Sequence, residues 1–368
     1  MIIPEKINLN LGENSYPIII GQDNLAALGN LIQELNLGRD IFLITNTVVA
    51  KLYGDTVIKH LRQAGIKHLQ MSVIPDGEQA KTIENWHKVL GEIADFDNGL
   101  NKRLVVVNLG GGVVGDLGGF VAAVYRRGIN FVQVPTTLLA NVDSGVGGKV
   151  AVNFKQGKNL VGAFYQPRLV FVDLSLLKSL PQAEMRAGLA EVVKYGVIAD
   201  SELFAFLEQN YHAILQYDLE ALHHIVRRSY QIKAQMVEQD ERDTKGIRAL
   251  LNFGHTFGHA IETATNYARY RHGEAVAIGM ICAAQLAEEL GMFSQGETQR
   301  LEALMAKIGL PAKIQGADLA QIMQAMTHDK KFVNKKNRFI LPVKIGEAAV
   351  KEGIDETLIK KIVARRLE

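Results

Sequence analysis

The sequence has almost no cysteine and no excess of charge of one sign. Cys282 is the single cysteine in 368 residues, so an internal disulfide framework is excluded, and its apolar neighbours predict a buried structural thiol and not a nucleophile. The formal net charge is only +2, with Lys and Arg spread over the whole length, so no basic tail or stripe indicates nucleic acid or an anionic membrane. We therefore expect a small-molecule partner.

Long hydrophobic runs are missing as well. No window reaches the ~18 continuous apolar residues of a membrane span, and the N-terminal MIIPEKINLN has polar residues where a signal peptide needs an apolar run. Hydrophobic residues make up 48% and charged residues 22%, the balance of an ordinary globular protein. We expect a soluble protein of the cytoplasm, and its length favours two domains.

Short apolar runs alternate with helical patterns in the first half of the chain. The runs PIIIG, DIFLIT, HLQMSVIP, RLVVVNLG, INFVQVP and RLVFVDL are apolar throughout, as are strands buried on both faces of a parallel sheet. From Pro181 to about Leu290 long helical periods follow with no convincing strand, and one strand-like piece, RFILPVKIG, comes late. The sequence predicts an α/β domain over 1–180, a mostly α-helical domain over 181–368, and a ligand in the cleft between them.

A glycine-rich turn follows the predicted strand Leu104 to Leu109. Gly110, Gly112 and Gly115 satisfy G-x-G-x-x-G between a strand and a helical pattern, where backbone N–H groups can meet a pyrophosphate. A tight turn in any α/β protein fits this pattern equally well, and no acidic residue lies about 20 residues on to hold a ribose. Other contacts would then come from loops after the strands, with the candidates Asn46, Asp76, Gly77, Glu78, Lys81, Thr136 and Thr137.

The segment from Arg248 to Glu262 carries a polar stripe in apolar surroundings. Arg248, Asn252, His255, His259 and Glu262 are spaced by four, three, four and three residues, so on a helix they form one continuous face. A solvent-exposed face is the plain alternative, but such faces usually carry Lys and Glu instead of imidazoles. We interpret the stripe as the wall of a site.

Two imidazoles four residues apart on a helix can bind a metal. In the metalloprotease motif a Glu follows the first His, whereas Thr256 follows His255, so peptide hydrolysis is disfavoured. Further ligands are available in His272 and in Glu191, a carboxylate within a largely apolar helical segment. For each residue alone, a capped or salt-bridged structural role fits the sequence equally well.

Basic residues gather in the segments between the two halves. Lys149 and Lys158 each follow a glycine in a predicted loop, from which an ammonium can reach a phosphate. Any single lysine of this kind is most often a solvated surface charge. Together with Arg248 they suit a ligand that carries both phosphate and carboxylate. Further donors are Arg127, Asn159, Lys233, Lys330 and Lys331.

The sequence closely resembles the 3-dehydroquinate synthase family, within the sugar-phosphate cyclases. The matching stretches are PDGEQAK, GGGVVGD, VPTTLLANVDSGVGGK, GKNLVGAF, AEVVKYG, LLNFGHTFGHAIE and HGEAVAIGM, in order from Asp76 to Met280. The resemblance implies a Rossmann-like N-terminal domain, a helical C-terminal domain, NAD, one zinc or cobalt ion and a homodimer. It also implies a reaction of the shikimate pathway. In that reaction 3-deoxy-D-arabino-heptulosonate 7-phosphate becomes 3-dehydroquinate and phosphate through transient oxidation, β-elimination, re-reduction and intramolecular aldol addition.

The resemblance further implies roles for individual residues. The metal ligands would be Glu191, His255 and His272, and His259 would shuttle a proton. NAD would contact Asp76, Gly77, Glu78, Gln79, Ala80, Lys81, Gly112, Val113, Val114, Gly115, Asp116, Thr136, Thr137, Lys149, Lys158, Leu176, Leu177, Lys178 and Ser179. The substrate would contact Asp143, Lys149, Lys158, Asn159, Lys233, Arg248, Asn252, Lys330 or Lys331, and Arg127 from across a dimer interface.

Three positions depart from the pattern of the family, namely Asn46, Val150 and Arg271. They leave the ribose contacts and the geometry of the metal loop open. The rival functions are a cyclase acting on sedoheptulose 7-phosphate or glucose 6-phosphate, a metal-dependent alcohol or glycerol dehydrogenase that would release NADH, and a non-catalytic nucleotide sensor. The basic set that suits a carboxylate argues against the first of these, and the complete metal and basic set argues against the last.

Overall fold

The computed structural model describes residues 4–97, 103–155, 157–328 and 337–368. The chain forms two compact units, one of Met1–Leu180 with Leu222–Arg242 and one of Pro181–Ala221 with Asp243–Glu368. The sequence predicts a second domain that runs uninterrupted from residue 181 to the C-terminus, and the segment Leu222–Arg242 departs from that division. It joins the first unit because its helix is held there by side-chain contacts, among them Arg227 Nε donating to Glu5 at 2.7 Å.

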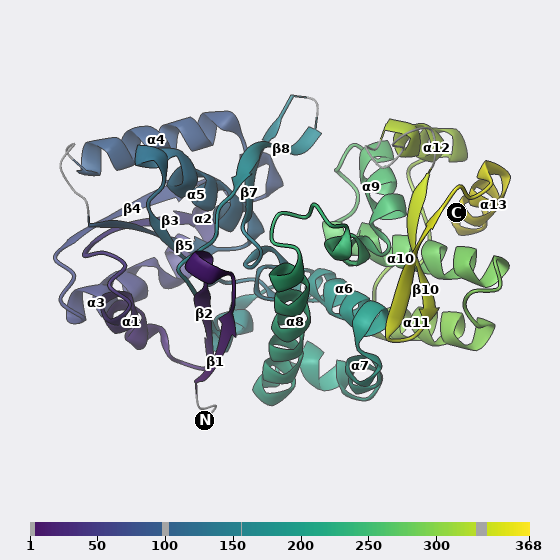
Figure 1. Cartoon of the computed structure of the whole chain (residues 1–368), viewed down its shortest axis with the longest axis horizontal. Helices are drawn as coiled ribbons and strands as arrows, with labels where there is room; N and C mark the ends of the chain where they lie inside the picture. Colours follow the sequence, from purple (N-terminus) through teal and green to yellow (C-terminus); the bar gives the residue numbers. More distant parts are fainter. Residues whose placement is uncertain (1–3, 98–102, 156, 329–336) are drawn as a thin grey trace. The chain divides into compact units, whose positions relative to one another are not determined.

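A seven-stranded sheet forms the centre of the first unit (Figure 1), in the order β1-β2-β9-β6-β5-β3-β4. All neighbouring strands are parallel except β1, which pairs antiparallel with β2. The six apolar runs are confirmed as strands, whereas the short edge strand β1, with the mixed sequence EKINL, was not predicted. The strands are β1 (Glu5–Leu9), β2 (Tyr16–Gly21), β3 (Asp40–Asn46), β4 (His68–Ile74), β5 (Leu104–Gly110), β6 (Asn130–Pro135) and β9 (Leu169–Asp173).

Helices cover both faces of this sheet. Side chains alternate between the faces along a strand, so Leu43 of β3 packs with α1 (Leu28–Glu34) and α3 (Asp55–Gln63). The next residue, Ile44, packs on the opposite face with α4 (Ile83–Asp97) and α5 (Gly112–Val124). Because neither face meets water, the central strands are apolar at most positions, which explains their hydrophobic runs.

The segment with Lys149 and Lys158 is a β-hairpin and not a pair of loops, so that prediction was wrong. β7 (Lys149–Phe154) pairs antiparallel with β8 (Gly157–Phe164). Glycine lowers strand propensity, and the glycines that flank and interrupt these strands hide the pattern in the sequence. The remaining elements of the first unit are η1 (Gly12–Asn14), η2 (Leu25–Ala27), α2 (Thr47–Val49), η3 (Ala50–Gly54), η4 (Glu78–Ala80), η5 (Tyr125–Arg127), η6 (Ala140–Ser144), η7 (Leu174–Ser179) and most of α8 (Leu219–Gln239).

The second unit is built around the apolar helix α10 (His272–Glu289). This helix packs against α6, α9, α11, α13 and β10. Cys282 lies in it fully buried, and burial raises the pKa of its thiol to about 12, so the prediction of a buried structural thiol is confirmed. The other elements are α6 (Gln182–Ala199), α7 (Ser201–Leu215), η8 (Ile247–Asn252), α9 (His255–Ala264), α11 (Gln295–Ile308), α12 (Leu319–His328), β10 (Arg338–Lys344), β11 (Glu347–Glu352) and α13 (Glu356–Arg366).

The predicted late strand RFILPVKIG is confirmed as β10, which forms a hairpin with β11. The helical character of the region after Pro181 is confirmed as well, since its elements up to Leu290 are helices. Within the described parts of the chain, no helix has the length and apolar character needed to cross a membrane.

A glycine allows α9 to begin close to α10. Gly254 has a left-handed backbone with φ +79°, which favours glycine over residues with a side chain. A Cβ atom at this position would lie 2.5 Å from Met280 Cγ and 2.9 Å from the carbonyl oxygen of Val276, both on α10. The chain therefore turns sharply at Gly254 and starts a new helix at His255.

Candidate active site

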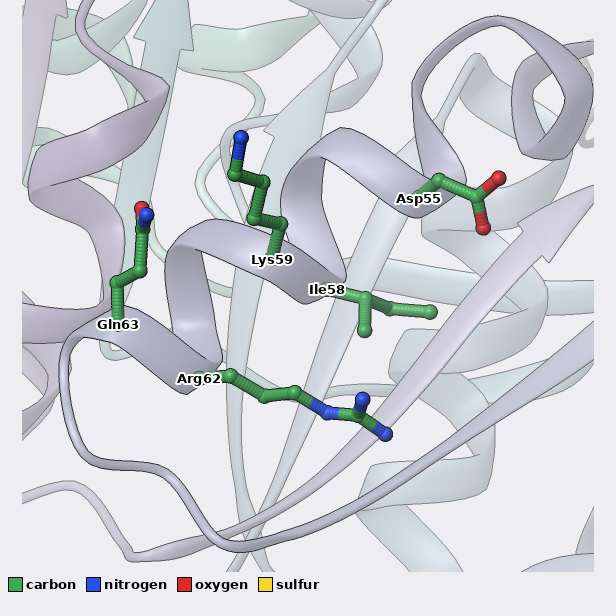
Figure 2. A pocket seen from close by; sticks show the side chains of 5 residues that line it. All are labelled: Asp55, Ile58, Lys59, Arg62 and Gln63. Atoms are coloured by element: carbon green, nitrogen blue, oxygen red, sulfur yellow. The ribbon is translucent and has the colours of Figure 1, made fainter.

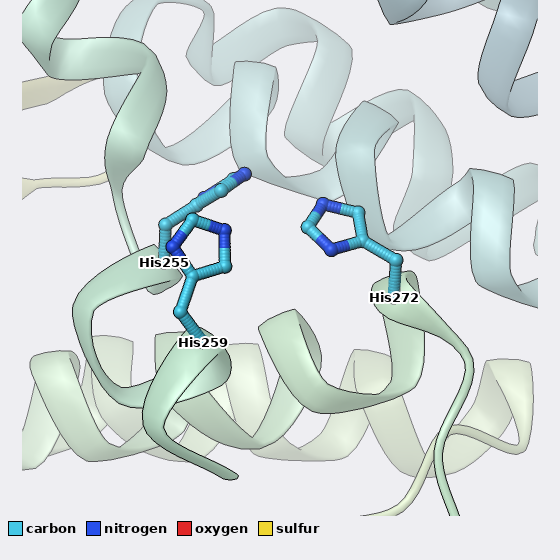
Figure 3. Close-up of side chains that lie close together, drawn as sticks. All are labelled: His255, His259 and His272. Atoms are coloured by element: carbon cyan, nitrogen blue, oxygen red, sulfur yellow. The ribbon is translucent and has the colours of Figure 1, made fainter. Parts of the chain in front are cut away.

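Three histidine rings face one another in the second unit (Figure 3). His255 and His259 come from α9, and His272 is the first residue of α10. The ring centroids of His255 lie 5.3 Å from those of both other histidines, and one nitrogen of each ring lies within 4.8 Å of the others. Spacing by four residues places the first two on one helix face, and packing of α9 on α10 adds the third.

The carboxylate of Glu191 lies against two of these rings. It stands in α6 and is fully buried, with Oε1 3.7 Å from His255 Nε2 and 3.6 Å from His272 Nε2. The ligand atoms of a tetrahedral zinc ion, with bonds of about 2.0 to 2.1 Å, are about 3.4 Å apart. Glu191 Oε1 therefore lies from each of the two imidazole nitrogens at close to the separation that one zinc or cobalt ion requires.

A backbone carbonyl oxygen orients the ring of His255 so that the ring can bind a metal. Its Nδ1 lies 3.1 Å from the carbonyl oxygen of Phe253, an acceptor, so we assign the proton to Nδ1. This tautomer leaves the lone pair of Nε2 directed toward Glu191. A hydrogen bond from the distal nitrogen is the usual way in which a protein orients a histidine ligand.

Lys194 belongs to the same cluster, although it was not predicted. It lies one helical turn after Glu191 on α6, and its ammonium pairs with Glu191 Oε2, with both side chains almost completely buried. Within the described chain no donor, Lys194 included, makes a hydrogen bond of acceptable geometry to either oxygen of Glu191. The lone pairs of the oxygen that faces the imidazoles therefore suit a metal. The i, i+3 spacing of a carboxylate and an ammonium in the apolar AEVVKYG helix is the signal that could have identified Lys194.

In the first unit the glycine turn has the context expected of a phosphate site. β5 ends at Gly110, and α5 begins at Gly112 without a side-chain cap on its first N–H groups. Those N–H groups and the positive end of the helix dipole favour an anion. The turn therefore retains the donors that a pyrophosphate needs.

Three predicted residues from separate segments meet beside this turn. The Lys81 ammonium lies 2.5 Å from Asp116 Oδ2 and 2.5 Å from Asn159 Oδ1. Burial raises the pKa of Asp116, while the charge of Lys81 opposes that shift. Nearby, Asn153 donates to Glu78 Oε1 at 2.9 Å. The cluster thus joins the PDGEQAK loop, the glycine-loop helix and the β-hairpin.

A second pair in the first unit joins Lys233 of α8 to Asp143 of η6. The Lys233 ammonium donates to the carboxylate and to the backbone carbonyl of Asp143, each at 2.5 Å. Asn46 also has a partner among the predicted residues, because its amide donates to Asp76 Oδ1 at 2.6 Å. The amide oxygen of Asn46 accepts from the N–H of Val49 and so caps α2.

Several side chains predicted to contact NAD face the protein core. Ala80, Val114, Leu176 and Leu177 are almost fully buried among other apolar residues. Any contact that these residues make with a ligand must use their backbone atoms. Lys178 is exposed at the end of η7, where the neighbouring Ser179 hydroxyl accepts from Tyr53 at 2.7 Å.

The polar stripe predicted as a single helix face is divided in the structure. Arg248, which is buried, and Asn252 lie on the 3-10 helix η8, whereas α9 begins only at His255. The prediction of one continuous face was wrong for the first two residues because Gly254 breaks the helix, and it holds for His255, His259 and Glu262.

Among the remaining predicted residues, Thr136 is buried, whereas Lys149 is exposed and Lys158 partly exposed on the β-hairpin. Arg127 is exposed on η5 with a left-handed backbone, φ +64°. Lys330 and Lys331 lie outside the described residues. A pocket of about 480 Å³ is lined by residues of α3 alone (Figure 2), and it contains none of the predicted site residues. The lining residues are Asp55, Ile58, Lys59, Arg62 and Gln63.

Comparison with known protein families identifies the chain over most of its length. A family model described as 3-dehydroquinate synthase N-terminal matches residues 71–187, and one described as 3-dehydroquinate synthase C-terminal matches residues 188–332. The chain belongs to the 3-dehydroquinate synthase family.

Similar proteins support this assignment. A 3-dehydroquinate synthase from Pelotomaculum thermopropionicum is 50% identical over 363 residues, covering 98% of this chain and 96% of the relative. Among solved structures, a 2-deoxy-scyllo-inosose synthase with carbaglucose-6-phosphate, NAD+ and Co2+ has a TM-score of 0.89 and 27% identity, covering 99% and 100% of the chains. A 2-epi-5-epi-valiolone synthase from Streptomyces hygroscopicus subsp. jinggangensis, with NAD+ and Zn2+ bound, has a TM-score of 0.88 and 27% identity, covering 97% and 98%.

The geometry leads to a prediction that separates metal ligands from their neighbour. Replacing Glu191, His255 or His272 by Ala should remove most of the bound zinc or cobalt, because each change deletes one of three atoms that face a common point. His259→Ala is the matched control and should retain the metal. Elemental analysis of the purified variants measures this, and loss of metal from His259→Ala with retention in Glu191→Ala would replace the predicted set by the three histidines.

Proposed function

We propose that the chain converts 3-deoxy-D-arabino-heptulosonate 7-phosphate into 3-dehydroquinate and phosphate. The single observation that carries this proposal is the cluster of the buried Glu191 carboxylate with the imidazoles of His255 and His272, in a chain of the 3-dehydroquinate synthase family. Such a donor set fits one zinc or cobalt ion and leaves a coordination position for a substrate oxygen.

We further propose that the first unit binds NAD. The turn from Gly110 to Gly112 presents helix N–H groups to a pyrophosphate, and Asp76, with its partner Asn46, is available to a ribose. The solved cyclases with NAD+ bound support this proposal. When bound, NAD supplies a site that accepts and returns hydride, and the metal supplies Lewis-acid polarisation of a substrate oxygen.

The basic residues form two groups, one for the phosphate and one for the carboxylate of the substrate. We propose that Lys149, Lys158 and Arg127 hold the substrate phosphate, since each carries a positive charge and N–H donors that suit phosphate oxygens. Arg248 would hold the carboxylate through its planar fork, with Lys233 and Asn252 beside it.

We propose that His259 transfers protons to and from the substrate. Its ring faces the two ligand imidazoles, yet His259 is the more accessible member of the cluster. An imidazole can gain or lose a proton near neutral pH, which suits a group that moves protons at a substrate carbon or hydroxyl. Asp143, Asn159 and Lys194 carry polar atoms that would orient substrate hydroxyls.

We also propose a cytoplasmic homodimer. The exposure of Arg127 and the left-handed turn that presents it support a role toward a partner subunit. Sedimentation equilibrium at micromolar protein concentration should give the mass of a dimer, and the mass of a monomer would contradict the proposed homodimer.

The proposed chemistry predicts that NAD acts in catalytic amounts. Hydride that leaves the substrate returns to it within each turnover. Phosphate release should therefore continue for many turnovers when the amount of NAD is far below the amount of substrate. The measurement combines a phosphate assay with absorbance at the NADH maximum. Steady accumulation of NADH in step with product would favour the rival dehydrogenase function, and equal rates with sedoheptulose 7-phosphate would favour another cyclase.

A second prediction concerns Arg248 and the substrate carboxylate. Arg248→Lys keeps the charge but loses two parallel hydrogen bonds, so kcat/KM for the keto-acid phosphate should fall about tenfold, the effect of losing roughly 1.4 kcal/mol. Metal and NAD binding should persist. Arg300→Lys is the matched control, because Arg300 makes a comparable fork with Glu208 at the surface. Unchanged kinetics in Arg248→Lys would remove the carboxylate argument against the other cyclases.

A further inference from the structure

The second nitrogen of His272 points to a buried carboxylate outside the predicted ligand set. Glu262 lies on α9, three residues after His259, and only 2% of its surface is exposed. Its Oε2 lies 3.3 Å from His272 Nδ1, while His272 Nε2 lies 3.6 Å from Glu191 Oε1. The imidazole of His272 therefore lies between two carboxylates, one at each nitrogen.

These two contacts are chemically distinct. A carboxylate at Nδ1 accepts a hydrogen bond, so Nδ1 carries the proton and Nε2 keeps its lone pair toward Glu191. A hydrogen-bonded carboxylate also makes the imidazole a more basic ligand and holds its plane. Glu262 itself faces Nδ1, whereas Nε2 is the nitrogen that faces Glu191, so Glu262 Oε2 is placed to orient His272 and not to bind the same ion.

The two proposed imidazole ligands differ in how they are oriented. His255 is held by the backbone carbonyl of Phe253, a group that any residue at position 253 would supply. The side chain of His255 is also almost fully buried. His272 begins α10, and 30% of its side chain is exposed, so packing restrains it less. The position of His272 therefore depends more on a side-chain partner, and Glu262 is in place to provide it.

We propose that Glu262 is a positioning residue that fixes the tautomer and ring orientation of His272 for a divalent metal. The inference rests on the proposed function in one respect, the presence of a metal at Glu191, His255 and His272. A purely structural role, in which Glu262 only pairs with a charged His272, predicts loss of stability without loss of metal affinity.

The test measures metal affinity on the metal-free full-length protein by competition with a chromophoric zinc chelator. Glu262→Gln should weaken zinc binding about tenfold, because an amide accepts the hydrogen bond less strongly, and Glu262→Ala should weaken it by up to about 100-fold. Glu274→Gln is the matched control, since it removes a carboxylate from the first turn of α10 that bonds Arg271 and not His272. The control should bind zinc within about threefold of the wild type, a margin below the smallest effect expected for an orienting residue.

Two further readouts separate the outcomes. The visible spectrum of the cobalt-loaded protein should change in Glu262→Gln, because the ligand field reports the orientation of His272, whereas thermal unfolding of the metal-free protein should change little. Wild-type zinc affinity and an unchanged cobalt spectrum in both Glu262 variants would overturn the proposal, as would absence of metal binding by the wild type. A wild-type protein that binds zinc as proposed but releases no phosphate would instead contradict the proposed function alone.

Discussion

The burial of one carboxylate at Glu191 constrains the whole second unit. An ionised carboxylate removed from water is costly unless cations or strong hydrogen-bond donors surround it. The structure provides an ammonium from Lys194 on one side and two imidazole nitrogens on the other. To bring His272 this close, the start of α10 must approach α6, and Gly273 permits it, because a Cβ there would lie 1.9 Å from the carbonyl oxygen of Ala187.

The chemistry is divided between two kinds of scaffold. In the first unit, Gly110 ends β5, and Asp76 and Thr136 follow β4 and β6, so all three lie at the carboxyl ends of parallel strands, where ligands of open α/β sheets bind. In the second unit, the polar groups project from helices into an otherwise apolar packing. The first scaffold presents backbone donors that suit an anion, and the second presents side-chain ligands that suit a cation.

Apolar runs made the central sheet predictable, since strands covered on both faces have few polar positions to obscure the pattern. The same reasoning failed where packing overrides local pattern. The hairpin with Lys149 was missed because close strand pairing tolerates glycines that look like loop residues. The helix expected from Arg248 onward is broken at Gly254 by its contact with α10, and α8 contacts β1 and η6 of the first unit, which no local periodicity reports.

The sequence by itself determined the family and the reaction, since the matching motifs are long, and through that resemblance it predicted Glu191, His255 and His272 as metal ligands. Only the tertiary structure decided that Lys194 joins Glu191 as a buried pair, that Phe253 orients His255, and that Glu262 faces the second nitrogen of His272. The physical reason is the separation along the sequence of the residues that must meet. Helical periodicity relates residues three or four apart, whereas a ligand cluster depends on how α6, α9 and α10 pack against one another.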